Sequence, residues 1–159
     1  MKKIGLYQVS ILAFFLILPV AAILAQCLWF PTGASLAQTA LKWFVFFAVG
    51  CRLFTSGLWQ VCRPGFTAED ILGVKDKQCF FFIRELGFAN LCFGLLGLLS
   101  VALPQFRGAA ALSGGLYFGL AGVQHIFSKK KTANEWLATL SDLFVFLVLG
   151  ILFALGGSR

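Results

Sequence analysis

The chain has 159 residues, of which 60% are hydrophobic and 12% are charged, and its mean hydropathy is +0.91. A soluble domain of this length could not bury so much apolar surface, and the charged share is about half the usual one. These values exclude a soluble fold and predict one domain, residues 1–159, in the lipid bilayer. The net charge of +7 is not arranged in basic stripes interleaved with aromatic residues, so nucleic acid is excluded as a partner.

Five apolar segments are long enough to cross a membrane. The hydrocarbon layer is ~30 Å thick, so a helix needs about 20 mostly apolar residues to span it. Backbone polar groups in lipid must be satisfied within the segment, which favours helices. The sequence therefore predicts an all-α integral membrane bundle of about five transmembrane helices. The predicted spans are Val9–Phe30, Leu36–Gln60, Cys79–Leu103, Ala109–Phe127 and Trp136–Gly156.

The first segment allows an alternative. Met1, Lys2 and Lys3 followed by an apolar run also resemble a secretory signal, whose cleavage would leave four helices. The apolar run is longer than in a typical signal, and no small-residue cleavage site closes it. These two features favour a first helix that is retained.

The basic residues set the expected orientation, because Lys and Arg concentrate in cytoplasmic loops. Most of them lie at the amino terminus and in the second and fourth connections, which predicts a cytoplasmic N-terminus. The residues on this side are Lys2, Lys3, Arg63, Lys75, Lys77, Lys129, Lys130 and Lys131, against Lys42, Arg107 and Arg159 on the other.

Six strongly polar residues stand inside the predicted spans, nearly all in the cytoplasmic half. They are Arg52, Arg84, Glu85, Asn90, His125 and Asp142. A charge at the bilayer centre costs about 2.5–3.5 kcal/mol on insertion scales, so such groups usually face the bundle interior and pair. Two arginines balance two carboxylates; pairing Arg52 with Glu85 and Arg84 with Asp142 is feasible, but the sequence does not assign the pairs.

Small residues form stripes on the third and fourth predicted helices. At 100° per residue, Gly87, Asn90, Gly94 and Gly97 fall within an arc of about 80°. Glu85 points about 140° away from Asn90, so the two cannot face one neighbour. Gly115, Gly119 and Gly122 form a similar stripe on the next helix. Such stripes allow close helix packing, and we expect these two helices to pack through them.

One stretch resembles a known family pattern, E-x-G-x-A-N-L-x-x-G-x-x-G, followed by a histidine on the next helix and a late aspartate. The matching residues here are Glu85, Gly87, Asn90, Gly94, Gly97, His125 and Asp142. The pattern resembles that of small bacterial multi-spanning membrane proteins of unknown function, loosely DoxX-like. This resemblance implies a bundle of four or five helices in the bacterial cytoplasmic (inner) membrane and marks Glu85, Asn90, His125 and Asp142, but implies no activity.

Three functions follow from these observations. The first is binding or transport of a small or lipid-like ligand in a polar pocket in the cytoplasmic half. Glu85 and Asp142 would be its ionisable groups, Arg52 and Arg84 the counter-charges, and Asn90 and His125 the orienting groups. The second is a structural or accessory subunit of a membrane complex, or a homo-oligomer. A quinone-linked enzyme is third, because the sequence has no catalytic, cofactor or metal motif and only one histidine.

Overall fold

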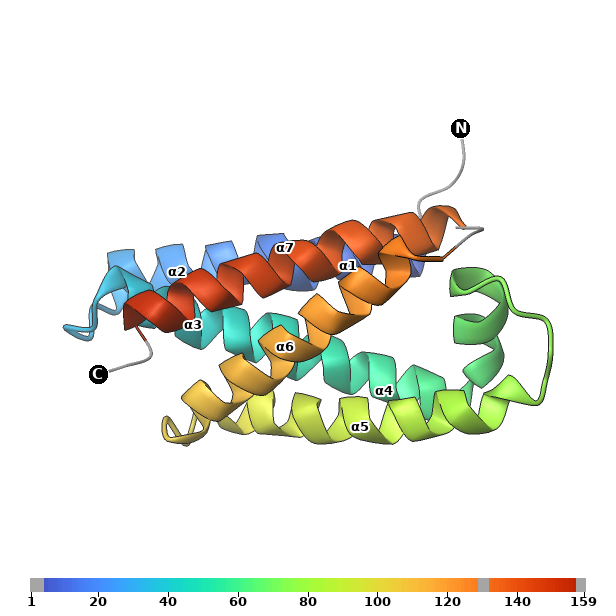
Figure 1. Ribbon diagram of the computed structural model, residues 1–159. Helices are drawn as coiled ribbons and strands as arrows, with labels where there is room; N and C mark the ends of the chain where they lie inside the picture. The colour runs from blue at the N-terminus through green and yellow to red at the C-terminus, as the bar shows by residue number, and fades with distance from the viewer. Residues whose placement is uncertain (1–4, 129–131, 157–159) are drawn as a thin grey trace.

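The computed structural model describes residues 5–128 and 132–156. Lys2, Lys3, Lys129–Lys131 and Arg159, which entered the orientation argument, lie outside the described residues. All regular secondary structure in the described part is helical, which confirms the all-α bundle (Figure 1). The elements, with η denoting a π-helix, are α1 (Leu6–Leu12), η1 (Ala13–Ile17), α2 (Leu18–Trp29), α3 (Leu36–Phe44), η2 (Val45–Cys51), α4 (Arg52–Cys62), η3 (Phe66–Ile71), α5 (Cys79–Leu99), α6 (Phe106–Ile126) and α7 (Ala133–Gly156).

Four helical stretches among the described residues are long and apolar enough to cross a membrane. They are Leu6–Trp29, Leu36–Cys62, Cys79–Leu99 and Ala133–Gly156, and their ends lie within four residues of those expected. The fifth long helix, α6, has the same length as α5, 21 residues, but it is richer in glycine and carries Arg107, Gln124 and His125. It runs obliquely across the bundle from the end of α5 to the start of α7 (Figure 1).

The two ends of the bundle differ in their connections (Figure 1). One end, called here the η3 end, holds η3, the start of α1, the end of α4, the end of α6 and the start of α7. The opposite end, called the Pro31 end, holds residues 30–35, residues 100–105 and the end of α7.

The connection between α4 and α5 contains η3, whereas the sequence suggested only a polar break there. Phe66 of η3 contacts the rings of Tyr7 and Trp59, with centroids 6.0 Å apart in both cases. Thr132 Oγ1 donates a hydrogen bond of 2.6 Å to the carbonyl oxygen of Ile71. Side-chain contacts of this kind tie η3 to α1, α4 and the start of α7, although its sequence lacks the long apolar periodicity that predicts a helix.

Two of the long helices contain a wide π-helical turn. The turn η1 ends two residues before Pro19, which has no N–H to donate and whose ring would clash with the preceding turn of an ordinary α-helix. The turn η2 lies directly before Arg52 and contains Gly50, which packs on the backbone of α5. Such turns are rare in proteins overall, and those that occur are often found at functional sites.

The glycine stripes of α5 and α6 do not face one another, so the expectation that these helices pack through them is wrong. A Cβ added to Gly94 would lie 2.4 Å from Phe54 N, and one added to Gly97 would lie 2.5 Å from Gly50 N. A Cβ on Gly119 would lie 2.8 Å from Phe146 Cδ2 of α7. Each stripe therefore packs against a sequence neighbour on its other side, α5 on the second span and α6 on α7.

We predict that Gly94→Ala lowers the free energy of unfolding by about 1–3 kcal/mol, because the added methyl group meets fixed backbone of the neighbouring helix. Gly150→Ala is the matched control, since an added Cβ there meets no atom within 4 Å. Unfolding of the purified protein by increasing denaturing detergent would measure both. Equal losses of stability in the two variants would contradict this packing.

Candidate functional site

Six polar side chains from five helices converge inside the bundle, and we call them the central cluster. The members are Tyr7 of α1, Arg52 and Gln60 of α4, Asn90 of α5, Tyr117 of α6 and Asp142 of α7. Three of the six expected site residues, Arg52, Asn90 and Asp142, belong to it.

Arg52 interacts with side chains of three helices in and around this cluster. Its guanidinium carbon lies 5.3 Å from the ring centroid of Tyr7 and 6.0 Å from that of Phe15. Its Nη1 donates a hydrogen bond to Ser56 Oγ, one turn further along α4. Asp142 interacts with it electrostatically from α7. The Nε atom of Arg52 is buried and has no hydrogen-bond partner among the described residues.

Asn90 is 2% exposed and lies on the glycine stripe of α5. Its Nδ2 donates a hydrogen bond of 2.7 Å to Gln60 Oε1 of α4, and the Tyr117 side chain lies beside it. This contact is possible because Gly57 and Gly87 let the two backbones approach closely. The Oδ1 atom of Asn90 is buried without a partner in the described part of the chain.

Four of the six members of the cluster lie well inside their spans, and Asp142 lies deeper than the sequence suggested. Arg52, Asn90, Tyr117 and Asp142 stand nine to eleven residues from the η3 ends of their helices, or about 14–17 Å along the axis. For Asp142 the difference arises because α7 begins at Ala133, three residues before the expected start. These four members therefore lie about half-way along their spans, whereas Tyr7 and Gln60 lie within two residues of the η3 ends of α1 and α4.

His125 belongs to a second polar pair nearer the η3 end. Its Nδ1 lies 3.3 Å from Glu135 Oε1, and Glu135 itself is only 2% exposed. Glu135 Oε2 is buried and lacks a hydrogen-bond partner among the described residues. On α7, Glu135, Thr139 and Asp142 follow at helical spacing, so the three share one face that leads from the η3 end towards the cluster.

Arg84 and Glu85 lie outside the central cluster. Both are exposed on the outward side of α5, while Asn90 and the glycines face inward. They stand five and six residues from the start of α5, or about 8–9 Å along the axis. Neither feasible pairing, Arg52 with Glu85 or Arg84 with Asp142, is formed among the described residues; the carboxylate that faces Arg52 is Asp142.

Sequence reasoning missed Tyr7, Gln60 and Tyr117 of the cluster, and also Glu135. The two tyrosines sit among many aromatic residues, and no local pattern separates them from core packing. Glu135 stands one residue before the expected start of the last span, Trp136–Gly156, so it is not among the polar residues inside the predicted spans. Its spacing to Thr139 and Asp142 is the signal that could have found it, once α7 is known to begin before Trp136.

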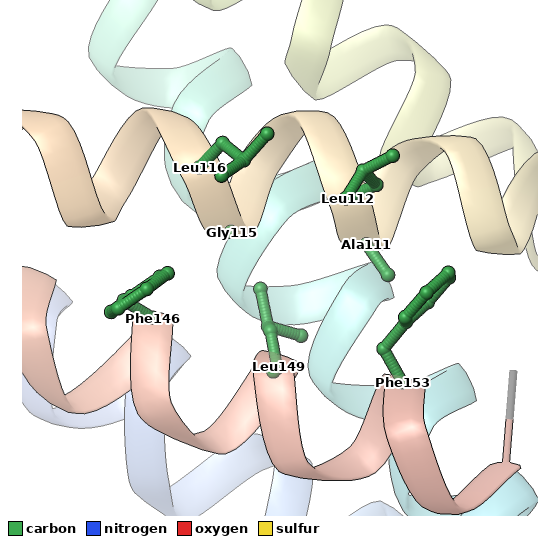
Figure 2. A pocket seen from close by; sticks show the side chains of 8 residues that line it. Ala111, Leu112, Gly115, Leu116, Phe146, Leu149 and Phe153 are labelled. Carbon is green, nitrogen blue, oxygen red and sulfur yellow. The ribbon is translucent and has the colours of Figure 1, made fainter.

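The described residues bring together no group of three or more His, Cys, Asp or Glu side chains that could hold a metal ion. An apolar crevice of about 60 Å³ lies between α6 and α7, and Figure 2 shows Leu116, Phe146 and Leu149 around it. This volume is far below the ~300 Å³ at which small-molecule sites begin, so the crevice is a packing gap at Gly115 and Gly150.

We predict that Asn90→Leu lowers the free energy of unfolding by about 1–2 kcal/mol, because Gln60 Oε1 then loses its donor inside the bundle. Replacing both residues by leucine should cost less than the sum of the two single changes. A double-mutant cycle of detergent-induced unfolding would measure this coupling. Strictly additive losses would show that the bond contributes nothing.

The comparisons with known proteins are consistent with this geometry but assign no activity. No curated protein and no solved structure matches the chain significantly. One family model does match, over residues 9–157. The match covers all of the long helices except the first three residues of α1. It also includes the His125–Glu135 pair and every member of the central cluster except Tyr7. The chain therefore belongs to a family of unknown function, DUF6790.

Proposed function

We propose that this membrane protein binds a small polar or lipid-like ligand at the central cluster. The observation that carries the proposal is that Arg52 Nε and Asn90 Oδ1 are both buried and have no hydrogen-bond partner in the part of the chain that the structure describes. A buried polar group without a partner costs about 1–3 kcal/mol. A bound molecule that supplies the missing partners would offset this cost.

The chemistry of these two atoms describes the ligand. Arg52 Nε carries a hydrogen-bond donor, and Asn90 Oδ1 is an acceptor. The ligand would therefore present an acceptor to α4 and a donor to α5. Tyr7, Phe15 and Tyr117 add aromatic walls, which suit an amphipathic molecule. Tyr7, Arg52, Tyr117 and Asp142 all keep part of their surface accessible, so they are not sealed by packing.

The ligand would enter from the η3 end. Glu135, Thr139 and Asp142 form a polar face from that end to the cluster, and intramembrane residues of this kind commonly mark ligand or proton pathways. The η3 end also carries Arg63, Lys75 and Lys77, which favours a cytoplasmic location by the positive-inside rule. With the bacterial origin and loose DoxX-like character that the sequence pattern implies, the proposed location is the bacterial inner membrane with the N-terminus in the cytoplasm.

Native mass spectrometry of the gently purified protein tests the proposal. We expect a discrete bound mass in the wild type and in Glu85→Gln, because Glu85 lies outside the cluster. Arg52→Gln should weaken binding at least about tenfold, or about 1.4 kcal/mol. Thermal unfolding would confirm that each variant is folded. The same bound mass at the same occupancy in a folded Arg52→Gln variant would refute the site.

A second candidate, an accessory subunit or homo-oligomer, is favoured by the exposed pair Arg84 and Glu85. Charged groups on a membrane helix usually face protein or water, since exposure to lipid is costly. Phe81, Phe82 and Phe88 are exposed on the same helix and would supply apolar contact area. A partner helix with complementary charges would cover this surface of α5. The described residues offer no contact that favours the quinone-linked enzyme over these two functions.

For this second function we predict that Arg84→Gln with Glu85→Gln dissociates a larger assembly seen in mild detergent. Lys75→Gln is the control, because Lys75 lies in the exposed connection between η3 and α5. Light scattering coupled to size-exclusion chromatography would report the mass of each. If the mass of the assembly were unchanged in the double variant, Arg84 and Glu85 of α5 would have no role in assembly.

A further inference from the structure

The Pro31 end holds a cavity of about 390 Å³ between α2 and α3. This volume lies within the ~300–1,000 Å³ range of small-molecule sites. Its lining contains both apolar and polar side chains, called here its apolar wall and its polar wall. The lining residues are Ala22, Ala25, Gln26, Phe30, Thr32, Lys42 and Trp43.

The polar wall is a built network around Gln26, which is 8% exposed. Its Oε1 accepts hydrogen bonds from Lys42 Nζ at 3.2 Å and from Trp43 Nε1 at 2.8 Å. Its Nε2 donates to Thr32 Oγ1 at 3.1 Å. The Lys42 ammonium also lies 4.5 Å from the centroid of the Trp43 ring. These contacts hold the ammonium group at the cavity.

A second positive charge, Arg107, lies outside the lining of the cavity. Arg107, at the start of α6, interacts electrostatically with Lys42. Its Nη2 donates to the carbonyl oxygen of Ser100 at 3.5 Å, and its Nε is buried without a partner among the described residues. Like charges repel, so an anion bound near both would stabilise this arrangement.

No acidic side chain of the protein lies at this end to supply that anion. All six acidic residues are described by the structure, and five stand in η3, in the connection after it, or within two turns of the η3 ends of α5 and α7. The sixth, Asp142, is in the central cluster. The six are Glu69, Asp70, Asp76, Glu85, Glu135 and Asp142.

We propose that this cavity binds a phosphate group, with Lys42 as the direct contact and Arg107 as the second positive charge. Phosphate is the common anion at the depth of lipid headgroups, where a tryptophan beside a lysine is typical of membrane interfaces. The apolar wall of Ala22, Ala25 and Phe30 suits the glycerol and upper acyl carbons of a phospholipid. Free inorganic phosphate would use the same two cations without that wall. This site is separate from the central cluster and does not depend on it.

Native mass spectrometry of the full chain in mild detergent, titrated with phosphatidylglycerol, tests the inference. Lys42→Gln and Arg107→Gln should each weaken binding about tenfold. Lys42→Arg keeps the charge and should retain most of the affinity. Lys75→Gln, at the opposite end of the bundle, should bind as the wild type does. Thermal unfolding shows which variants are folded.

Two further titrations use the wild type alone, so they hold even where a variant does not fold. Diacylglycerol, which lacks the phosphate, should bind at least about tenfold more weakly than phosphatidylglycerol. Millimolar inorganic phosphate that displaces the lipid would identify free phosphate as a competent source, and failure to displace it would identify the lipid headgroup. Equal binding of diacylglycerol, or wild-type affinity in a folded Lys42→Gln variant, would overturn the phosphate site.

Discussion

The charge of a guanidinium half-way along a membrane helix is costly, so neighbouring side chains must stabilise it. Arg52 carries such a charge in this bundle. Its insertion alone costs about 2.5–3.5 kcal/mol. Compensation comes from three helices: the rings of Tyr7 and Phe15 on the first span, Ser56 one turn further along α4, and Asp142 on α7. A cation over an aromatic face contributes about 0.5–2 kcal/mol, so neither ring alone offsets this cost. The relative positions of α1, α4 and α7 are thereby coupled through one side chain.

The spans were predictable because lipid imposes a length and a composition on any helix that crosses it. The four stretches that meet both requirements begin and end close to where the apolar runs do. The partners of each helix were not predictable from the same information. The stripe of Gly87, Gly94 and Gly97 identifies a face that permits close approach, yet a face without side chains says nothing of which helix will approach it.

The site was predictable in part for a related reason. Depth along a helix follows from counting residues, and it placed the strongly polar residues, Arg52, Asn90 and Asp142 among them, nearly all in one half of the bilayer. Direction around the helix also follows from counting, and it separated Glu85 from Asn90 on α5, as the structure has them. The tyrosines of the cluster and Glu135 depend on how several helices cross, which is a property of the tertiary packing. Counting along one helix contains no information about such crossings.

The direction in which Arg52 points around its helix depends on the number of residues in the wide turn η2, which directly precedes it. A π-helical turn accommodates one residue more than an α-helical turn, so the segment Val45–Cys51 offsets the two halves of the second span relative to an uninterrupted helix. Removing one residue there would preserve the hydropathy of the span and rotate α4 by about 100° relative to α3. Arg52 would then move away from Tyr7 and Asp142. Gly57 would lose its close approach to Gly87, and Gly94 its close approach to Phe54. Among related chains, a single-residue gap in this segment would therefore mark a change of site that substitutions alone would not reveal.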